Sequence, residues 1–508
     1  MKAITCILTA VAIFISLLAQ GQSGTLDYTF GDEGITLQSV TGAEQSTDIH
    51  ILNDGKILTL ANKLTNGYMS DIILMRHNTD GTLDNTFGMD GFSMISVPNG
   101  DVWGEHMKIV DESIYIGGGI FDINSNHYNF LAVKCNLTDG SLDDSFGGTG
   151  YVITDPDPTT FNLGYGIGVQ DDGKVLVAGK VFENIGFVRH NADGSLDNTF
   201  GNNGIVICDF VENTANFCYD IDVLPDGKIL ASGYSDDTPA VVRLNTDGTF
   251  DPTFGIDGKA LLVDHNGWIF DHEIQLDGKI LIAGNTLDQV AMVCRLNSDG
   301  SIDNTFGTAG AFILPTQPDY LGSWLYAVTV QADGKPLLGG FLSPTTTYIT
   351  DNLLARLTVD GQLDETFGDN GIATIINLGS DVEETRAIAV QADEKIVCVG
   401  NNMVSSEYKE ILIARFHGDL ETGNPDWSQQ NTQVLIYPNP VNDQLNIISH
   451  GNWNYNQIEI VDLAGQTVYS KNSNLHKATI DVSWLSNGVY FLKLYSDNKI
   501  EIQKLIKQ

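Results

Sequence analysis

The stretch Asp80-Gly81-Thr82-Leu83-Asp84-Asn85-Thr86-Phe87-Gly88 recurs with small changes along most of the chain. Its phenylalanine returns at intervals of 57, 59, 54, 54, 52 and 61 residues, at Phe30, Phe87, Phe146, Phe200, Phe254, Phe306 and Phe367. Seven copies at this period are typical of propellers and solenoids. Asp-Gly supplies a turn, and apolar residues flank the polar aspartate, so each copy is interpreted as a packed corner between two strands. A catalytic role would require several identical active sites in one molecule, which we do not expect.

Two more patterns accompany the corner. An alternating strand runs into Asp-Gly-Lys and a second apolar strand, as at residues 221–224 and 228–233, which is a strong hairpin signal. A third apolar strand ends in a basic residue before the corner, and a fourth strand follows Phe-Gly. The basic residues are Arg76, Lys134, Arg189, Arg243, Arg295, Arg356 and Arg415. Bidentate bonding suits a repeated staple, so we expect them to pair with corner carboxylates such as Asp84 or Asp197.

Four short strands per repeat predict an all-β chain, with a seven-bladed β-propeller over residues 22–418. The chain opens with a corner and a fourth-type strand, whereas the last basic-ended strand has no full corner after it. We therefore predict that residues 34–40 close the ring by pairing with residues 411–415. Closure would remove the exposed edges of an open array.

Charge is distributed unevenly. The formal net charge is −39, from 26 basic and 65 acidic residues, while residues 433–508 are neutral. The excess negative charge therefore lies in the rest of the chain, and it disfavours a nucleic acid or an anionic membrane as a partner. The two interpretations of this charge are an inert acidic surface and a surface that binds cations.

The first 21 residues predict a signal peptide, with Lys2 before an apolar stretch and cleavage before Gln22. No other stretch is expected to span a bilayer, so we predict no transmembrane segment in the mature protein. Five cysteines follow the leader. Cys135, Cys294 and Cys398 lie in apolar runs and are expected to be buried thiols, whereas Cys208 and Cys218 are left either free or bonded to each other.

A different unit follows a polar linker at residues 419–432. Residues 433–508 alternate in short apolar strands, which predict a small antiparallel β-sandwich. The four signatures of the unit are YPNP, LNI, DLAG and LSNGVYFLKL. Their marker residues are Tyr437, Pro438, Asn439, Pro440, Asp462, Gly465, Gly488 and Tyr490.

Both parts resemble known families. The corner and hairpin motifs are similar to the delta-60 repeats of secreted bacterial proteins over residues 24–418, a resemblance that implies a propeller and no known reaction. Residues 434–508 resemble the type A C-terminal sorting domain of the type IX secretion system of Bacteroidetes-type bacteria. That resemblance implies passage across both membranes and contact with the secretion machinery. It further implies a surface sortase, with release of the cargo or its attachment to the cell surface. An ordinary accessory sandwich is the alternative.

Acidic residues stand before several hairpins. Asp48, Asp220 and Asp271 lie six residues before the hairpin aspartate, with Glu105 in a similar place, and His50, His106, Asp222, His272 and Glu273 lie nearby. The first strand of a propeller blade lies nearest the axis, so these residues could ring one mouth of the central channel. Oxygen-rich sets suit Ca²⁺, the one cofactor we consider possible. Polar residues in water at the starts of strands are the alternative.

Aromatic residues fall in the segments that connect one repeat to the next. They are Trp103, Tyr165, Tyr219, Trp268 and Trp324. Rigid aromatic side chains around a rim suit binding of a glycan or a protein, and packing between blades is the alternative.

These patterns favour an exported binding module over an enzyme. A propeller glycosidase or lyase would need two carboxylates about 5–10 Å apart in one pocket, for which Asp48, Glu105, Asp220 and Asp271 are the only candidates. A purely structural surface protein is a third possibility.

Overall fold

The computed structural model describes residues 22–419 except 41–42, 66–67, 211–213, 318, 346–349, 376–381 and 406–407. It also describes residues 434–507 except 438–440, 442–443, 450–454, 462–466, 476, 487 and 496–499. The predicted signal peptide and nearly all of the predicted linker lie outside these residues. The chain divides into two compact units, which meet in the sequence between Leu420 and Glu421.

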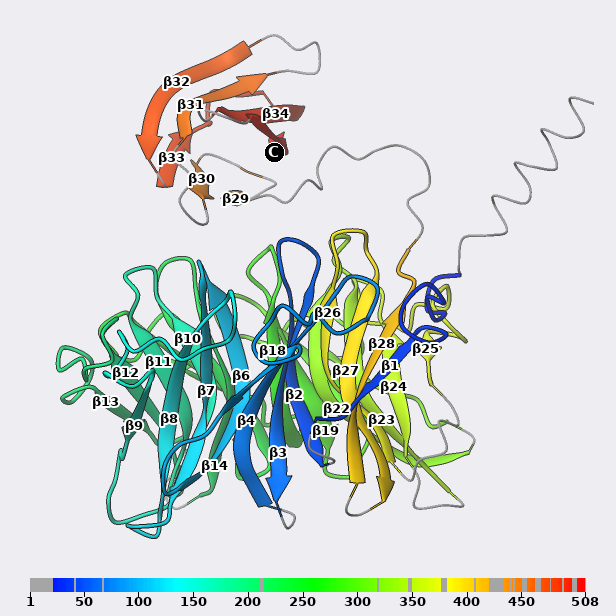
Figure 1. The fold of residues 1–508 in the computed structure, drawn as a ribbon. Helices are drawn as coiled ribbons and strands as arrows, with labels where there is room; N and C mark the ends of the chain where they lie inside the picture. Colours follow the sequence, from blue (N-terminus) through cyan, green and yellow to red (C-terminus); the bar gives the residue numbers. More distant parts are fainter. Residues whose placement is uncertain are drawn as a thin grey trace, which may run out of the picture. The chain divides into compact units, whose positions relative to one another are not determined.

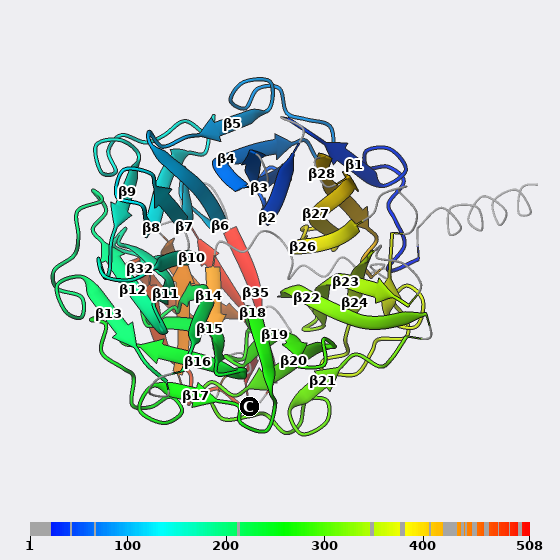
Figure 2. The same cartoon turned by 90° about the horizontal axis from the view of Figure 1, so that it is seen from below.

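Seven four-stranded antiparallel sheets form the first unit, and Figures 1 and 2 show them as the blades of a ring. From the innermost strand outward, the first four blades are β2 (Glu44–Ile51), β3 (Ile57–Thr65), β4 (Tyr68–His77) and β5 (Phe92–Ile95); β6 (Gly100–Val110), β7 (Ser113–Asp122), β8 (His127–Asn136) and β9 (Tyr151–Thr154); β10 (Asn162–Val169), β11 (Val175–Val181), β12 (Asn184–His190) and β13 (Ile205–Cys208); and β14 (Asn216–Val223), β15 (Ile229–Ser235), β16 (Thr238–Leu244) and β17 (Lys259–Leu261). The other three are β18 (Gly267–Ile274), β19 (Ile280–Thr286), β20 (Ala291–Leu296) and β21 (Ala311–Ile313); β22 (Tyr320–Val330), β23 (Pro336–Pro344), β24 (Asp351–Arg356) and β25 (Ile372–Ala373); and β26 (Val382–Val390), β27 (Ile396–Ser405), β28 (Tyr408–Phe416) and β1 (Ile35–Gln38).

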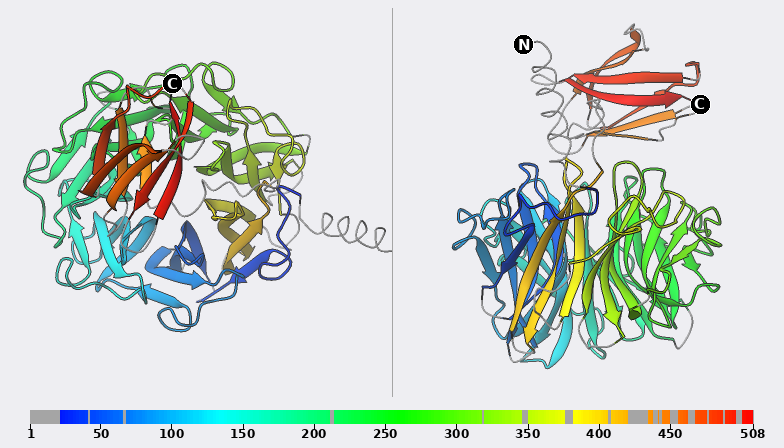
Figure 3. Two further views of the ribbon diagram at one scale, coloured as in Figure 1. Left: turned by 90° about the horizontal axis from the view of Figure 1, so that it is seen from above. Right: turned by 90° about the vertical axis from the view of Figure 1, so that its right-hand side faces the viewer.

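The last blade confirms the predicted closure. Strand β1, from the start of the chain, pairs antiparallel with β28, with Ile35 opposite Ala414 and Gln38 opposite Ile411. The first and last parts of the propeller thus share one sheet. In the left view of Figure 3, which shows the ring from above, the blue start of the chain lies beside the yellow last blade. Pairing β1 with the final blade covers the edge of β28, which would otherwise be unpaired.

The recurrent corner is a structural staple, as predicted. Nε of Arg76 donates to Oδ2 of Asp84 at 2.7 Å, and its guanidinium carbon lies 4.6 Å from the centroid of the fully buried Phe87 ring. The same guanidinium donates to the Leu137 and Thr138 carbonyls of the next repeat at 3.1 Å. Ion pairing, a cation–π contact and a blade-to-blade hydrogen bond therefore meet at one side chain. The six other copies keep the ion pair, with Lys134 and Asp143 at 2.8 Å in the one lysine version.

The second unit is a two-sheet antiparallel sandwich, as predicted. One sheet contains β29 (Val434–Tyr437), β30 (Gln444–Ser449) and β33 (Lys477–Asp481). The other contains β31 (Tyr455–Val461), β32 (Thr467–Leu475), β34 (Gly488–Tyr495) and β35 (Ile500–Lys507). Their shared core includes Leu445, Ile460 and Leu492, all buried. Within the part of the chain that the structure describes, no helix has the length and apolar character needed to cross a bilayer.

Candidate functional site

Every innermost strand carries a β-bulge at the same place. The pairing of β2 with β3 skips Thr47, and that of β18 with β19 skips Phe270. The seven skipped residues are Thr47, Glu105, Tyr165, Tyr219, Phe270, Tyr326 and Arg386. A bulge bends its strand and redirects a side chain, so the fold presents seven equivalent positions, here called the bulge positions.

Glycines on the second strands make room for these bulges. A Cβ atom on Gly284 would overlap the carbonyl oxygen of Trp268, and one on Gly340 would overlap that of Trp324. Gly118, Gly179, Gly233 and Gly400 stand in the same relation to the first strands of their blades. In these six blades the glycine of the second strand is thus explained by close backbone approach rather than by a turn.

Four consecutive bulge positions are aromatic. The ring centroids of Tyr165 and Tyr219 lie 4.9 Å apart, those of Tyr219 and Phe270 5.2 Å apart, and those of Phe270 and Tyr326 6.0 Å apart. The interplanar angles are 49°, 63° and 58°, so the rings do not cover one another's faces. We call these four half-buried residues the aromatic arc.

A second row of rings supports the arc. Trp268 and Trp324 stand two residues before their bulge positions, and their ring centroids lie 5.9 Å apart. Trp324 contacts the Phe270 ring at 5.8 Å. The row also includes Phe217, Tyr234 and Phe341, through contacts of 4.7 Å between Phe217 and Tyr234 and 6.2 Å between Trp324 and Phe341.

Charged residues adjoin the arc in the remaining blades. The Arg386 guanidinium carbon lies 4.0 Å from the Tyr326 ring centroid, and Nε of Arg386 lies 3.8 Å from Glu384. Burial raises the pKa of Glu105, against the opposing charges of Arg386 and His106. Burial also raises the pKa of Tyr326 to about 12, so this hydroxyl stays neutral and can donate a hydrogen bond.

The five predicted aromatic residues divide into two groups, and one prediction about them was wrong. All five lie on innermost strands rather than in the connections between repeats, because these strands begin earlier than the alternation suggested. Tyr165, Tyr219, Trp268 and Trp324 belong to the two rows described above. Trp103 is only 9 % exposed and packs against Tyr128 at 6.1 Å, so it serves packing within its blade.

Two of the four predicted carboxylates, Asp48 and Asp271, are held by backbone amides. Asp48 accepts hydrogen bonds from the Ile49 and Met107 amides, both at 2.7 Å. Asp271 accepts from the His272 amide at 2.8 Å and the Val328 amide at 2.7 Å. Each thereby joins its own strand to the first strand of the next blade.

Glu105 stands one position away from its expected place. It occupies a bulge position, and His106 is the equivalent of Asp48. The hairpin of the second blade is one residue shorter than the others, with Val110 paired directly to Ser113, so counting back from its aspartate gave the wrong register.

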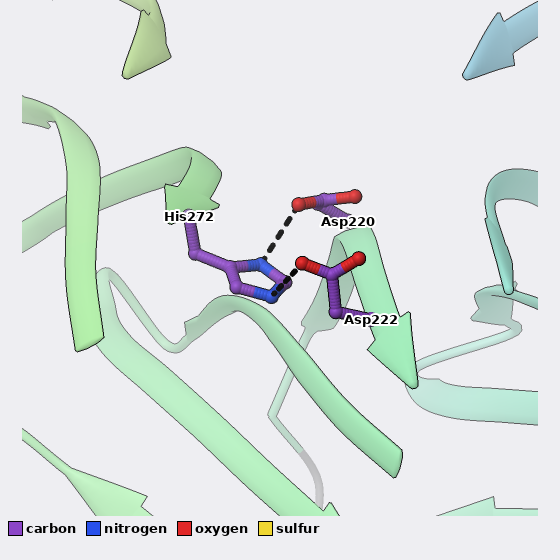
Figure 4. A group of neighbouring side chains, drawn as sticks. All are labelled: Asp220, Asp222 and His272. Carbon is purple, nitrogen blue, oxygen red and sulfur yellow. Dashed lines mark ion pairs between the residues drawn. The ribbon is translucent and has the colours of Figure 1, made fainter. Parts of the chain in front are cut away.

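Asp220 is the predicted carboxylate that lies in a cluster of possible metal ligands. One ligand atom from each of Asp220, Asp222 and His272 lies within 4.8 Å of the others. Nδ1 of His272 is 2.9 Å from Oδ2 of Asp220, and Nε2 is 3.7 Å from Oδ2 of Asp222 (Figure 4). Nζ of Lys108 donates to Oδ1 of Asp222 at 2.7 Å. A set that includes imidazole differs from the all-oxygen set that suggested Ca²⁺.

Electrostatics around this cluster follow from burial and crowded carboxylates. Burial would lower the pKa of His272, but the charges of Asp220 and Asp222 raise it to about 9. Burial and then the charge of Asp222 raise the pKa of Glu273 to about 7. Burial also raises the pKa of Asp271, and the negative charge of Asp220 raises it further. Negative charge is therefore in excess here.

The residues that sequence reasoning missed are Phe270, Tyr326 and Arg386 of the bulge positions. A signal for them exists, because each stands seven residues before a hairpin aspartate, as do Tyr165 and Tyr219. In the second unit, Tyr437 ends β29, Gly488 begins β34, and the Tyr490 hydroxyl donates to the Ser486 carbonyl at 2.9 Å. Pro438, Asn439, Pro440, Asp462 and Gly465 lie outside the described residues.

Comparison with known proteins agrees with this architecture. A family model described as a domain of unknown function (DUF5122) beta-propeller matches residues 52–87, 170–200, 224–254, 275–306 and 331–367. A model described as a secretion system C-terminal sorting domain matches residues 435–508. No curated protein matches the sequence.

Several solved structures are similar at low identity. PorZ, a surface component of the type-IX secretion system of Porphyromonas gingivalis, is 12% identical, with 89% of this chain and 68% of that chain covered and a TM-score of 0.34. The polysaccharide lyase Uly1 is 12% identical, with 79% and 93% covered and a TM-score of 0.41. A protein from Lactobacillus plantarum is 13% identical, with 87% and 100% covered and a TM-score of 0.38. Similarity of this degree carries no functional argument. The chain is therefore a β-propeller in which five stretches match the DUF5122 beta-propeller model, followed by a segment that matches a secretion system C-terminal sorting domain and so indicates export to the cell surface or secretion.

Proposed function

We propose that this exported propeller is a binding module and that the aromatic arc holds its ligand, a glycan chain. The observation that supports the proposal is the continuous row of four tilted, half-buried rings at equivalent positions of consecutive blades. Sugar rings present flat C–H faces that pack on aromatic faces, and rigid aromatic anchors dominate binding energetics. The sorting domain would deliver the module to the secretion machinery and a surface sortase.

Polar groups at the ends of the arc would complete recognition. Arg386 beside Tyr326 offers hydrogen-bond donors, and the neutral Tyr326 hydroxyl offers both a donor and an acceptor. A few directed polar groups among apolar surfaces are the usual composition of a ligand site. A neutral glycan with free hydroxyl groups fits this arrangement better than a protein helix, because successive sugar rings could meet the four aromatic rings one after another along consecutive blades.

The enzyme hypothesis receives less support. Asp48, Asp220 and Asp271 each have both carboxylate oxygens engaged by backbone amides or by His272. A glycosidase needs one carboxylate to protonate the leaving group and a second to attack or to activate water. Carboxylates fixed in interblade hydrogen bonds are poorly suited to either role.

The test uses the chain without residues 1–21 in affinity electrophoresis through gels that contain neutral or acidic polysaccharides. Product formation is measured by reducing ends and by absorbance of unsaturated sugars. We expect retardation by at least one neutral polysaccharide and no product. Product formation that is lost in Asp220→Asn would support an enzyme, and absence of retardation by every polysaccharide would contradict the glycan proposal.

A further inference from the structure

Two exposed phenylalanines stand on neighbouring segments of the third blade. Phe161, directly before β10, is 63% exposed, and Phe182, in the turn between β11 and β12, is 52% exposed. The Phe182 amide donates to the Phe161 carbonyl at 3.0 Å, so the two segments are held together at this point. Large apolar side chains that share one exposed place mark an interaction site more often than single ones do.

The backbone of Phe182 has a conformation that phenylalanine rarely adopts. Its φ is 54°, in the left-handed region, which bulky side chains disfavour and asparagine and aspartate tolerate. The corresponding hairpins of the second, fourth and fifth blades have polar residues at positive φ, namely Asn126, Asp236 and Gln289. An exposed phenylalanine in a strained turn contributes little to the fold, so contact with another molecule accounts for it better.

Aromatic rings of the second blade support Phe161 from below. The ring centroid of Phe161 lies 5.9 Å from that of Tyr128, and Tyr128 in turn contacts Phe121 at 4.9 Å and the buried Trp103 at 6.1 Å. Strand β8, which carries Tyr128, lies beside β10 and β11 (Figure 2). The exposed rings therefore rest on strands of two blades, and such a preorganised surface loses little freedom on binding. We call Phe161, Phe182 and Tyr128 the rim patch.

Acidic residues surround the rim patch. The segments 122–127, 155–161 and 182–183 hold neither lysine nor arginine, and their acidic residues are Asp122, Asp155, Asp157 and Glu183. Nδ1 of His127 lies 3.8 Å from Oδ2 of Asp155, so the first two of these segments adjoin each other. An apolar centre with a negative rim complements a positively charged partner. A second copy of this chain, with a formal net charge of −39, would instead be repelled.

We propose that the rim patch docks a protein segment in which an apolar side chain is flanked by lysine or arginine. The apolar side chain packs on the rings of Phe161 and Phe182, and the basic residues meet the acidic rim. The two exposed rings carry no hydrogen-bonding group. A glycan, whose hydroxyl groups need polar partners, therefore suits the rim patch less than the aromatic arc, where Tyr326 and Arg386 supply such partners.

The experiment measures the binding of fluorescein-labelled synthetic peptides to residues 22–508 by fluorescence anisotropy. The probe has Phe-Leu between two pairs of lysines, and the reference peptide has Ser-Ser in place of Phe-Leu. We expect the probe to bind the parent more tightly than the reference does, and roughly fivefold more weakly to Phe182→Asn. Ile256→Asn is the matched control, because it replaces an 81% exposed apolar side chain beside Asp257, and it is expected to bind as the parent does.

Three results in the peptide assay would overturn the proposal. They are absence of probe binding by the parent, equal binding of the probe and the reference peptide, and equal affinity of Phe182→Asn and the parent for the probe. The second result would mean that charge alone attracts the peptide. An equal loss in Ile256→Asn would likewise show that the rim patch has no special part in binding.

Two further readouts separate docking from folding and from glycan binding. The melting temperature of Phe182→Asn is expected to equal or exceed that of the parent, because asparagine tolerates the positive φ. If it falls instead, Phe161→Ser provides the same binding test on the neighbouring ring. Retardation by a polysaccharide is expected to be unchanged in Phe182→Asn, since the rim patch and the aromatic arc consist of different residues. Loss of that retardation would assign the rim patch to the glycan and overturn the protein partner.

Discussion

Nε of Arg415 donates a hydrogen bond to Oδ2 of Asp27 at 2.9 Å, across 388 residues of chain. Both side chains are buried, and the same guanidinium donates to the Thr79 carbonyl at 2.5 Å and lies 4.7 Å from the Phe30 ring centroid. One arginine near the end of the propeller therefore binds the first corner of the chain and the repeat after it. This staple and the β1–β28 pairing together close the ring.

Replacing Arg415 by alanine is expected to destabilise the whole propeller. Removal of Arg415 leaves the buried Asp27 with Lys395, at 3.2 Å, as its remaining counter-charge, so we expect a loss at the lower end of the range of about 3–5 kcal/mol that breaking a buried ion pair costs. The measurement is the urea midpoint of unfolding. Arg415→Lys should lower the free energy of unfolding less, because Lys134 forms the equivalent ion pair in the second blade. A midpoint unchanged in Arg415→Ala would show that the closure does not depend on the staple.

Acid should weaken the propeller through the corner carboxylates. The hydrogen bond from Lys134 lowers the pKa of Asp143 to about 2, and in Asp364 the effects of Thr366 and Arg356 outweigh burial and also give about 2. A carboxylate whose pKa is lowered by folding stabilises the fold above its unfolded pKa of about 3.9, and this contribution is lost as pH falls toward 2. The melting temperature should therefore fall between pH 4 and pH 2. Asp143→Asn should show a shallower fall, and an identical pH profile in that variant would contradict this account.

The glycines on the second strands test whether close approach to the bulged first strand explains their presence. Gly284→Ala would place a methyl group against the Trp268 carbonyl, and overpacking of this kind costs about 1–3 kcal/mol. The first blade has Ala61 at the equivalent place, opposite Ser46, so Ala61→Gly is the matched control with a smaller loss. The measurement is the melting temperature of each variant, compared with that of the parent protein. Equal losses would mean that close approach does not explain the glycine.

The cysteines are expected to remain free thiols after export. Cys135, Cys208, Cys218, Cys294 and Cys398 are all buried and unbonded, so the alternative of a Cys208–Cys218 bond is not the one that the structure adopts. Burial raises the pKa of Cys208 to about 12, which suppresses its reactive thiolate. A thiol reagent should label none of the five in native protein lacking residues 1–21 and all five after unfolding. A count of three in the unfolded, unreduced protein would reveal a disulfide.

The sequence predicted the repeating parts of this molecule better than its variable ones. The corner, the hairpin and the basic-ended strand recur, so each copy supported the others, and the pattern alone predicted the pairing of Arg76 with Asp84. Residues at the bulge positions vary from Thr47 to Tyr165 to Arg386, and a bulge inserts one residue that strand alternation does not reveal. The sequence therefore placed Asp220 near the axis, but the contact of His272 with Asp220 and Asp222 depends on a twist between blades that no local pattern contains.

The most direct test of the central claim is the affinity of Phe270→Ala for the polysaccharide that retards the parent protein, measured by isothermal titration calorimetry. Phe270 lies in the middle of the aromatic arc, and Tyr28→Ala, which removes a 72% exposed ring outside the arc, is the control. We predict a Kd at least tenfold weaker for Phe270→Ala, about 1.4 kcal/mol, and an unchanged Kd for Tyr28→Ala. An unchanged Kd for folded Phe270→Ala would contradict the assignment of the arc as the binding site.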